Sequence, residues 1–303
     1  MSQPRLLVVG GSGFIGRHVV SRAGAMNWDV TCLSLNTRQL PKGVSSVVAD
    51  LSDRTALNAS LADARFDYVV NCGGYIDHTL FKSGGRKLLE SHFDGLMNLV
   101  EILDRSTLKS FVNIGSSDEY GSGLAPQAES LREAPISPYS LGKTAATHFL
   151  QMLHRTEALP TTTLRLFLTY GPGQSENRFI PQIIRGCLKD VPFPVSGGQQ
   201  LRDFCFIDDT IRAIFMTLES AKARGEVLNI ASGQPITIRE MIENVRRMVG
   251  RGQPQFGQLA YRPGENMALY ADISRAKALL GWTPEVDISE GLKRTLSWME
   301  SQK

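Results

Sequence analysis

The sequence has few of the residues that build metal centres and disulfide frameworks. It contains four cysteines and five histidines in 303 residues, and no two cysteines form a C-x-x-C pair. The histidines lack the spacing typical of metal ligands. We therefore expect no metal site and free, mostly buried thiols. The four cysteines are Cys32, Cys72, Cys187 and Cys205.

Strong charge of one sign and long apolar runs are also missing. The net charge is only +3, and the sequence has no long run of lysine and arginine, so nucleic acid is not an expected partner. No apolar run approaches the ~20 residues that span a bilayer. Residues 6–9 lead straight into glycines rather than into a signal-peptide cleavage site. We expect a cytoplasmic protein without a membrane partner.

A glycine-rich turn near the start is the first informative feature. Residues 5–9 are mostly apolar and predict a buried strand, and Gly10, Gly13 and Gly16 follow before a helical pattern. Gly11 gives a second interpretation as G-x-G-x-x-G. Such glycines allow the tight turn, the approach of a pyrophosphate and the packing of helix on strand. The alternative is a turn with no ligand.

Predicted strands and helices alternate after this turn. Such alternation favours an α/β fold with a doubly wound parallel sheet, whose ligands bind at the carboxyl ends of the strands. An aspartate before Thr210, either Asp208 or Asp209, predicts the N-cap of a further helix. The other expected elements are strands at 29–33, 44–49, 67–71 and 110–114, a long helical region at 82–108 and an amphipathic helix at 289–298.

The end of the second strand indicates the choice of dinucleotide. An acidic residue ~20 residues after the glycines would bind the adenosine ribose and repel a 2′-phosphate, and none is present. Ser34, Asn36 and Arg38 stand there instead, and Arg38 suits a 2′-phosphate unless it is a solvated loop charge. NADP(H) is therefore favoured, with NAD(H) as the alternative. The expected cofactor contacts are Gly10, Gly13, Phe14, Ile15, Gly16, Ser34, Asn36, Arg38, Asp50, Leu51, Cys72, Gly73 and Lys143.

A tyrosine and a lysine four residues apart carry the predicted chemistry. Tyr139 and Lys143 open a helical pattern and share one helix face. A tyrosine with an ordinary pKa of about 10 needs a nearby cation to act as an acid–base group at neutral pH, and Lys143 would supply it. A hydroxyl of Ser117, or of its neighbour Ser116, would bind the same substrate oxygen. The alternative is an exposed pair on an amphipathic helix.

Taken in order, these motifs resemble the extended short-chain dehydrogenase/reductases that act on nucleotide sugars. The resemblance implies an NAD(P)-binding Rossmann domain at about 1–170 and a smaller nucleotide-sugar-binding α/β domain at 171–303. It also implies a homodimer and a nucleotide-diphosphate sugar contacted by Asn177, Arg202 and Arg262, although either arginine could instead form a surface ion pair. The likeness extends over 165–173, 177–181, 202–209, 229–233, 262–265, 271–276 and 280–284.

Two positions depart from the family pattern. Leu168 replaces a usual asparagine in the segment 165–170, and His92 replaces another on the helix after the fourth strand. Each departure removes an expected contact, which leaves the pose of the substrate open. Asn177 is the candidate for replacing the lost contact with the diphosphate.

The segment 170–209 is similar to reductases of the abequose and paratose synthase type. With the loop at 34–38, which suits a 2′-phosphate, this similarity favours NADPH-dependent reduction of the C4 ketone of a nucleotide-linked 6-deoxy-4-ketohexose. Tyr139 would protonate the alkoxide, and Lys143 would also hold the nicotinamide ribose.

Three other functions stay open. Asp118 and Glu119 resemble the acid–base pair of nucleotide-sugar 4,6-dehydratases, although Tyr120 follows them one residue too early for that pattern. An NAD-dependent 4-epimerase or 4-dehydrogenase is the second alternative. A non-catalytic dinucleotide-sensing module is the third, and the presence of both Tyr139 and Lys143 argues against it.

Overall fold

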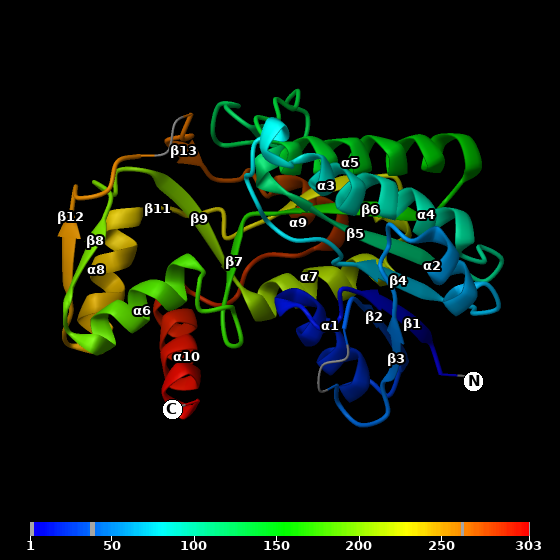
Figure 1. Cartoon of the computed structure of the whole chain (residues 1–303), viewed down its shortest axis with the longest axis horizontal. Coiled ribbons are helices and arrows are strands. Elements are labelled where there is room, and N and C mark those ends of the chain that lie inside the picture. The colour runs from blue at the N-terminus through cyan, green and yellow to red at the C-terminus, as the bar shows by residue number, and fades with distance from the viewer. Residues whose placement is uncertain (1–2, 37–39, 262–263, 303) are drawn as a thin grey trace.

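A parallel sheet with helices on both faces forms the larger part of the protein (Figure 1). The computed structural model describes residues 3–36, 40–261 and 264–302. Within these residues the sheet has seven strands in the order β10-β6-β5-β4-β1-β2-β3, and each adjacent pair is parallel. The strands are β1 (Arg5–Val9), β2 (Asp29–Ser34), β3 (Ser45–Val48), β4 (Tyr68–Asn71), β5 (Ser110–Ser116), β6 (Thr161–Leu166) and β10 (Val227–Ile230).

The apolar strands are buried because helices cover the sheet on both sides. Successive side chains of a strand point to opposite faces, so Leu6 and Val8 of β1 enter one core and Leu7 and Val9 enter another. This arrangement confirms the predicted α/β Rossmann class. The first face is covered by α1 (Phe14–Ala25) and α7 (Ile207–Glu219), and the second by α2 (Arg54–Leu61), α4 (Gly95–Ile102) and α5 (Pro138–Glu157).

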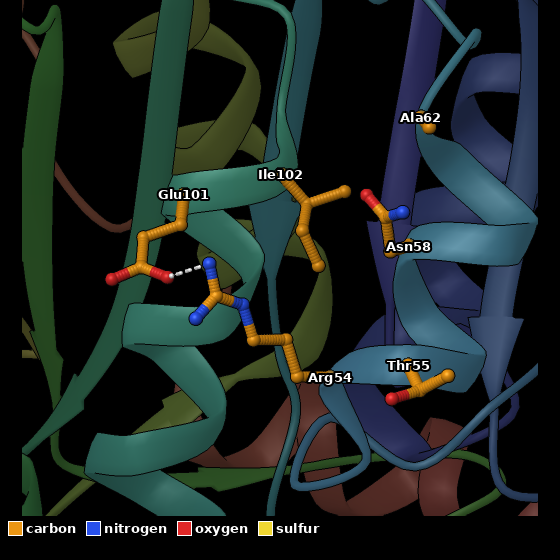
Figure 2. A pocket seen from close by; sticks show the side chains of 6 residues that line it. All are labelled: Arg54, Thr55, Asn58, Ala62, Glu101 and Ile102. Carbon is orange, nitrogen blue, oxygen red and sulfur yellow. Dashed lines mark ion pairs between the residues drawn. The ribbon is translucent and has the colours of Figure 1, made fainter.

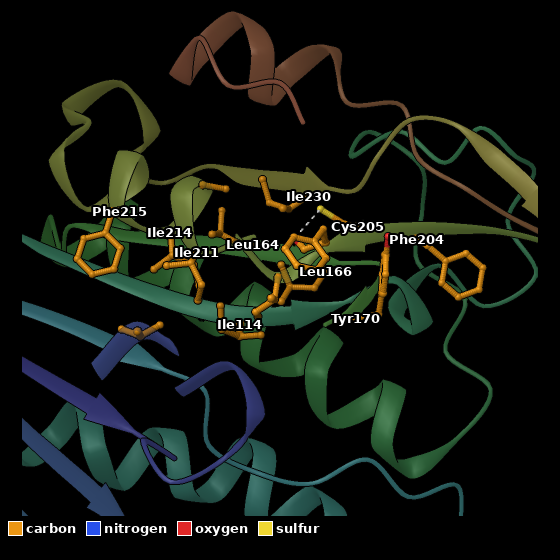
Figure 3. Close-up of a cluster of buried hydrophobic side chains, with 14 of the residues drawn as sticks. Ile114, Leu164, Leu166, Tyr170, Phe204, Cys205, Ile211, Ile214, Phe215 and Ile230 are labelled. Atoms are coloured by element: carbon orange, nitrogen blue, oxygen red, sulfur yellow. Dashed lines mark hydrogen bonds between the residues drawn. The ribbon is translucent and has the colours of Figure 1, made fainter. Parts of the chain in front are cut away.

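The first core continues without a break into the C-terminal part of the chain. Figure 3 shows Ile211 and Ile214 of α7 beside Ile114 and Leu164 of the sheet. Tyr170 extends the same cluster toward the second lobe, where its ring packs edge-on against Phe204 at 6.2 Å and Phe206 at 5.6 Å between centroids. The two lobes therefore share buried apolar contacts.

The second lobe is built around β9, which pairs with β7, β11 and β13. The chain crosses between the lobes, because α7, β10 and α9 (Ser274–Leu280) follow residue 170 and yet pack with the large sheet. The other elements of this lobe are β7 (Leu168–Tyr170), α6 (Phe179–Lys189), β8 (Pro192–Val195), β9 (Leu201–Phe206), β11 (Pro235–Thr237), α8 (Ile238–Val249), β12 (Gln253–Phe256), β13 (Ala268–Leu269) and α10 (Ile288–Ser301).

The long helix expected at 82–108 is interrupted. A 3₁₀ turn (Phe81–Ser83) ends at Gly84, whose φ of +104° is a conformation that favours glycine. The short helix α3 (Arg86–Leu89) then runs into a π-helical turn (Glu90–Asp94) before α4. After Ile102 the backbone becomes extended at Leu103. The apolar spacing survives these breaks, so periodicity alone does not reveal them.

The predicted aspartate N-cap of α7 is wrong. Phe206 occupies the cap position, and Asp208 and Asp209 lie in the first turn. The Asp209 carboxylate accepts hydrogen bonds from the backbone N–H groups of Glu285 (3.0 Å) and Val286 (2.9 Å). It therefore anchors the segment before α10, a long-range role that the local pattern does not indicate.

The cysteines are free and mostly buried, as the sequence predicts. All four thiols are free, and only Cys72 is not fully buried. In the described ranges no cluster of His, Cys, Asp and Glu could hold a metal ion. None of the helices there is both long enough and apolar enough to cross a membrane.

Candidate active site

The carboxyl ends of β4 and β5 meet the first turn of α5. Helix α5 begins here because Ser137 caps it, its Oγ accepting from the Ser140 N–H at 3.1 Å, and Pro138 occupies the first turn. Tyr139 and Lys143 lie on the buried face of this helix, 4% and 7% exposed. The structure thus brings together the two residues that the four-residue spacing predicts on one face.

Lys143 reaches from α5 to the end of β5. Its Nζ donates a hydrogen bond of 2.7 Å to the Ile114 carbonyl. Burial lowers the pKa of Lys143 to about 8, while the charge of Glu119 and then Cys72 act in the opposite direction. The ammonium is therefore present at neutral pH and loses its proton as the pH rises through about 8.

Tyr139 does not have the lowered pKa that its spacing from Lys143 predicts. Burial raises the pKa of the phenol, and the carboxylate of Asp118 adds to this effect. The Ser116 hydroxyl and the Arg178 guanidinium lower the pKa, but by less. Removal from water dominates because the ring is almost completely enclosed. The ammonium of Lys143, already bound to a backbone carbonyl, does not reverse it.

Two histidines pack edge-on against the Tyr139 ring. Their centroid distances are 5.0 Å for His92 and 5.9 Å for His78. His92 Nε2 lies 2.8 Å from the Tyr75 carbonyl, which only accepts, so this nitrogen carries the proton. Burial, helped by the charge of Lys143, lowers the pKa of His92 to about 3 and keeps the ring neutral. His92 is therefore a neutral, hydrogen-bonded ring that packs against one side of the phenol.

The serines lie where β5 ends in a 3₁₀ turn (Ser117–Tyr120). Ser116 caps this turn, and its Oγ accepts from the Asp118 N–H at 3.1 Å. The same hydroxyl interacts with Tyr139. Ser117 is also buried, but Ser116 is the residue that the geometry places against the phenol. Of the two serines considered from sequence, Ser116 is thus the stronger candidate.

Asp118 and Glu119 point in different directions. The Asp118 carboxylate is 32% exposed and lies 3.9 Å from His78 Nε2. The Glu119 side chain is fully buried, and its Oε2 accepts from Thr147 Oγ1 at 2.9 Å and from Arg165 Nε at 2.8 Å. The two carboxylates that the sequence suggests as acid and base therefore have different surroundings, one partly exposed and one fully buried. This placement favours a structural role for Glu119.

The glycine turn has the geometry that a dinucleotide pyrophosphate requires. Gly10 has a φ of +70°, and a Cβ at Gly16 would lie 2.2 Å from the Gly10 carbonyl oxygen. Gly13 precedes α1 without a side-chain cap, and the first turn, which includes Phe14 and Ile15, has no acidic residue. The free N–H groups at this helix start suit an anion.

The end of β2 and the turn at Asp50 are where the sequence predicts contacts with the adenosine half of the dinucleotide. Ser34 is buried at the end of β2, and its Oγ donates to the Asn36 carbonyl at 2.8 Å. Arg38 lies outside the described residues. Asp50 accepts from the Ser52 N–H at 2.9 Å in a local turn. The end of β2 therefore presents neutral groups in the part that the structure describes.

Gly73 lies two residues after the end of β4. Its N–H donates to Asn71 Oδ1 at 3.0 Å, and a Cβ at this position would lie 3.1 Å from the Leu51 side chain. Burial raises the pKa of the neighbouring Cys72 thiol to about 12, so it stays protonated. Gly73 is thus half-buried and closely packed, and a side chain there would crowd Asn71, Val9 and Leu51.

The substrate side contains residues that sequence reasoning missed. Arg178, which follows the expected contact Asn177, is close enough to lower the pKa of Tyr139. Its place in the segment 177–181 is the only signal for it in the sequence, and His78 has none. Arg202 on β9 forms an ion pair with Glu265, and Arg262 lies outside the described residues.

A separate surface hollow of about 450 Å³ lies between α2 and α4 (Figure 2). Arg54 and Glu101 form an ion pair of 3.0 Å across it. Thr55, Asn58 and Ile102 complete most of the lining. The hollow thus contains none of the groups around Tyr139.

The sequence matches a known family over most of its length. The family model described as "NAD dependent epimerase/dehydratase family" covers residues 6–231. The chain belongs to the NAD dependent epimerase/dehydratase family. Membership confirms the resemblance stated from the motifs and makes the protein an enzyme of an NAD-dependent family. A preference for NADP(H) stays a prediction.

Relatives within the epimerase/dehydratase family catalyse different reactions. The chain is 33% identical over 232 residues to UDP-glucuronate 4-epimerase of Thermodesulfobacterium geofontis, covering 73% of this chain and 71% of that protein. It is 27% identical over 325 residues to dTDP-glucose 4,6-dehydratase of Xanthomonas campestris pv. campestris, covering 96% and 92%. UDP-glucuronic acid 4-epimerase from Bacillus cereus, solved with UDP-glucuronic acid and NAD, matches with a TM-score of 0.86 and 27% identity over 99% and 100% of the chains.

Proposed function

We propose that the protein transfers hydride between a nicotinamide dinucleotide and C4 of the hexose of a nucleotide-diphosphate sugar. The observation that carries this proposal is the arrangement of Tyr139, Lys143 and Ser116 at the end of β5, where Cys72 lies between Lys143 and Gly10 of the glycine turn. A solved relative with 27% identity binds UDP-glucuronic acid and NAD, which supports the ligand class. The glycine turn and Lys143 would hold the dinucleotide, and Arg202 and Asn177 would contact the nucleotide sugar.

The chain's own residues would handle the proton. The dinucleotide supplies or accepts the hydride. Tyr139 would exchange a proton with the sugar oxygen at C4, and Ser116 would hold that oxygen by a hydrogen bond. Because Lys143 is an ammonium below its pKa of about 8, it would stabilise the phenolate form of Tyr139. His92 would exclude water from one side of the ring.

We infer that the overall reaction is reduction of a 4-keto-6-deoxy sugar with NADPH. Glu119 is buried in an ion pair with Arg165, whereas the Asp118 carboxylate lies near His78, and this arrangement argues against dehydration by these two residues acting as an acid–base pair. Ser34 and Asn36 at the end of β2 do not repel a 2′-phosphate. Such a step would produce a nucleotide-linked deoxysugar.

A 4-epimerase is the second candidate function. The relative that is 33% identical over 73% of this chain is a UDP-glucuronate 4-epimerase. An epimerase needs the same proton donor and hydride acceptor but returns the hydride to the sugar. The two reactions therefore differ in the fate of the dinucleotide rather than in the residues around C4.

One pair of measurements separates the candidates. The purified protein is denatured and any released dinucleotide is identified, and NADPH oxidation is then followed with 4-keto-6-deoxy sugars on dTDP, GDP, CDP and UDP. We expect no retained dinucleotide and stoichiometric NADPH consumption with one of them. Retained NAD(H), together with conversion of UDP-glucuronic acid without net NADPH oxidation, would instead identify the epimerase.

A further inference from the structure

A buried carboxylate lies directly behind the proposed catalytic residues. The Oε1 atom of Glu119 accepts from the Ser116 N–H at 2.9 Å, and its Oε2 accepts from Thr147 Oγ1 at 2.9 Å. Thr147 is four residues after Lys143 on α5, so it lies one turn further along the same helix face. One carboxylate thus joins the end of β5 to the helix that carries Tyr139 and Lys143.

Arg165 of β6 balances this carboxylate. Its Nε lies 2.8 Å from Glu119 Oε2 and its Nη2 2.5 Å from Glu133 Oε1, while its guanidinium stacks on the Tyr120 ring at 4.6 Å. The remaining Nη1 atom is buried without a hydrogen-bond partner among the described residues. Buried ion pairs with an unsatisfied atom contribute little net stability, because the cost of desolvation offsets the attraction. The cluster is therefore poorly explained as a stabilising feature alone.

The charges around Lys143 give a better explanation for the buried Glu119 carboxylate. Cys72 faces Lys143 from the end of β4 and is a protonated thiol, and His92 faces it from the π-helical turn and is neutral. Tyr139 lies on the same helix and holds its proton, because burial raises its pKa. Glu119 is thus the negatively charged group among those that act on Lys143 in the described part of the chain.

We propose that Glu119 is a positioning residue of the active site, which fixes the Ser116 strand end against α5 and whose negative charge keeps Lys143 in its ammonium form. The catalytic meaning of this role rests on the proposed function, in which Lys143 acts as a cation beside Tyr139. Glu119 itself does not touch the substrate. Glu133 contacts the same arginine through Nη2 and has no bond to the Ser116 strand end or to Thr147 in the hydrogen bonds of the described residues.

This difference provides a matched pair of variants, Glu119→Gln and Glu133→Gln. Each removes one negative charge from Arg165, so both should lower thermal stability. The ionisation of Lys143 is followed by ¹³C NMR of protein labelled at the lysine Cε, with Lys143→Arg to assign the signal. Only Glu119→Gln should lower the midpoint of the Lys143 titration, by about one pH unit. An unchanged midpoint in Glu119→Gln, or equal shifts in both variants, would overturn the proposal.

Thr147→Val tests the positioning part, including the case in which Glu119→Gln does not fold. It removes the donor on α5 and keeps the charge, so NADPH oxidation should slow about tenfold with whichever 4-keto-6-deoxy sugar on dTDP, GDP, CDP or UDP the wild type consumes, while the Lys143 titration stays at its wild-type midpoint. Wild-type turnover in Thr147→Val would contradict positioning through Thr147. If the wild type turns over none of the four nucleotide-linked sugars, the NMR titration still decides the role of Glu119, and it is the proposed function that fails.

Discussion

Lys143 of α5 is hydrogen-bonded through Nζ to the Ile114 carbonyl of β5 at 2.7 Å. Ile114 lies two residues before Ser116, so this bond holds the ammonium next to the strand end that carries the hydroxyl. A buried ammonium is costly unless it is paired or hydrogen-bonded. Here the effect of burial on Lys143 is larger than the opposing effect of the Glu119 charge, so the pKa of Lys143 falls to about 8. The side chain therefore changes its charge within the pH range of an ordinary activity assay.

The rate should therefore fall on the alkaline side. Lys143 is active as the cation, which is present below its pKa and is lost as the pH rises through about 8. We expect kcat/KM to show an alkaline limb near that pH in the free enzyme. Lys143→Arg keeps the charge at every accessible pH, so its residual activity should lack the limb. A limb that persists in Lys143→Arg would assign it to another group.

Tyr139→Phe should abolish most of the activity and leave the fold intact. The change removes only the phenolic oxygen, and the ring keeps its edge contacts with His92 and His78. Loss of an acid–base group typically costs about 10²–10⁴-fold in rate. Tyr75→Phe removes the same atom from a nearby side chain that is 48% exposed, and should be neutral. Thermal unfolding of both variants checks the fold, and full activity of Tyr139→Phe would contradict its role.

Two glycines of α1 allow a test of the dinucleotide turn. A Cβ at Gly16 would lie 2.2 Å from the Gly10 carbonyl oxygen, whereas a Cβ at Gly24 would meet no atom within 4 Å. Gly16→Ala must displace the turn, so we expect loss of NADPH and NADH binding and a free energy of unfolding lower by about 1–3 kcal/mol. Gly24→Ala should keep binding and stabilise α1 by about 0.5–1 kcal/mol. Fluorescence titration and chemical denaturation measure both; tight binding by Gly16→Ala would count against the turn as the cofactor site.

The parts that sequence predicts well are those encoded by local patterns. The first strand begins and ends where its apolar run predicts, and Tyr139 and Lys143 share a face because helical spacing fixes it. The break at Gly84 is harder to predict, since the apolar spacing continues through it. Local pattern thus establishes the order of the elements better than their continuity.

The parts that sequence does not predict depend on distant partners. Asp118 and Glu119 are adjacent and look equivalent, but the 3₁₀ turn points them in different directions, and of these two only Glu119 pairs with Arg165. Burial of Tyr139 comes from elements far along the chain, so its raised pKa could not be deduced from the spacing to Lys143. Contacts between residues far apart in the sequence can be identified only from the folded structure.

Arg202 is the described residue best placed to test recognition of a diphosphate. It lies on β9, largely buried, and is paired with Glu265. Lysine keeps the charge but cannot bind a diphosphate with two parallel N–H groups. We expect Arg202→Lys to weaken binding of the preferred nucleoside diphosphate about ten- to a hundredfold, because one charge-assisted hydrogen bond contributes roughly 1.5–3 kcal/mol.

Arg185→Lys is the matched control for this change. Arg185 is an exposed residue on α6 of the same lobe, and its guanidinium lies 2.7 Å from the Glu176 carboxylate. Such surface ion pairs contribute little to stability. Calorimetric titration of wild type, Arg202→Lys and Arg185→Lys with UDP, dTDP, GDP and CDP first identifies the base that binds most tightly and then compares the dissociation constants for it. Equal affinities in wild type and Arg202→Lys would remove Arg202 from the proposed binding site and leave its ion pair with Glu265 as a structural contact.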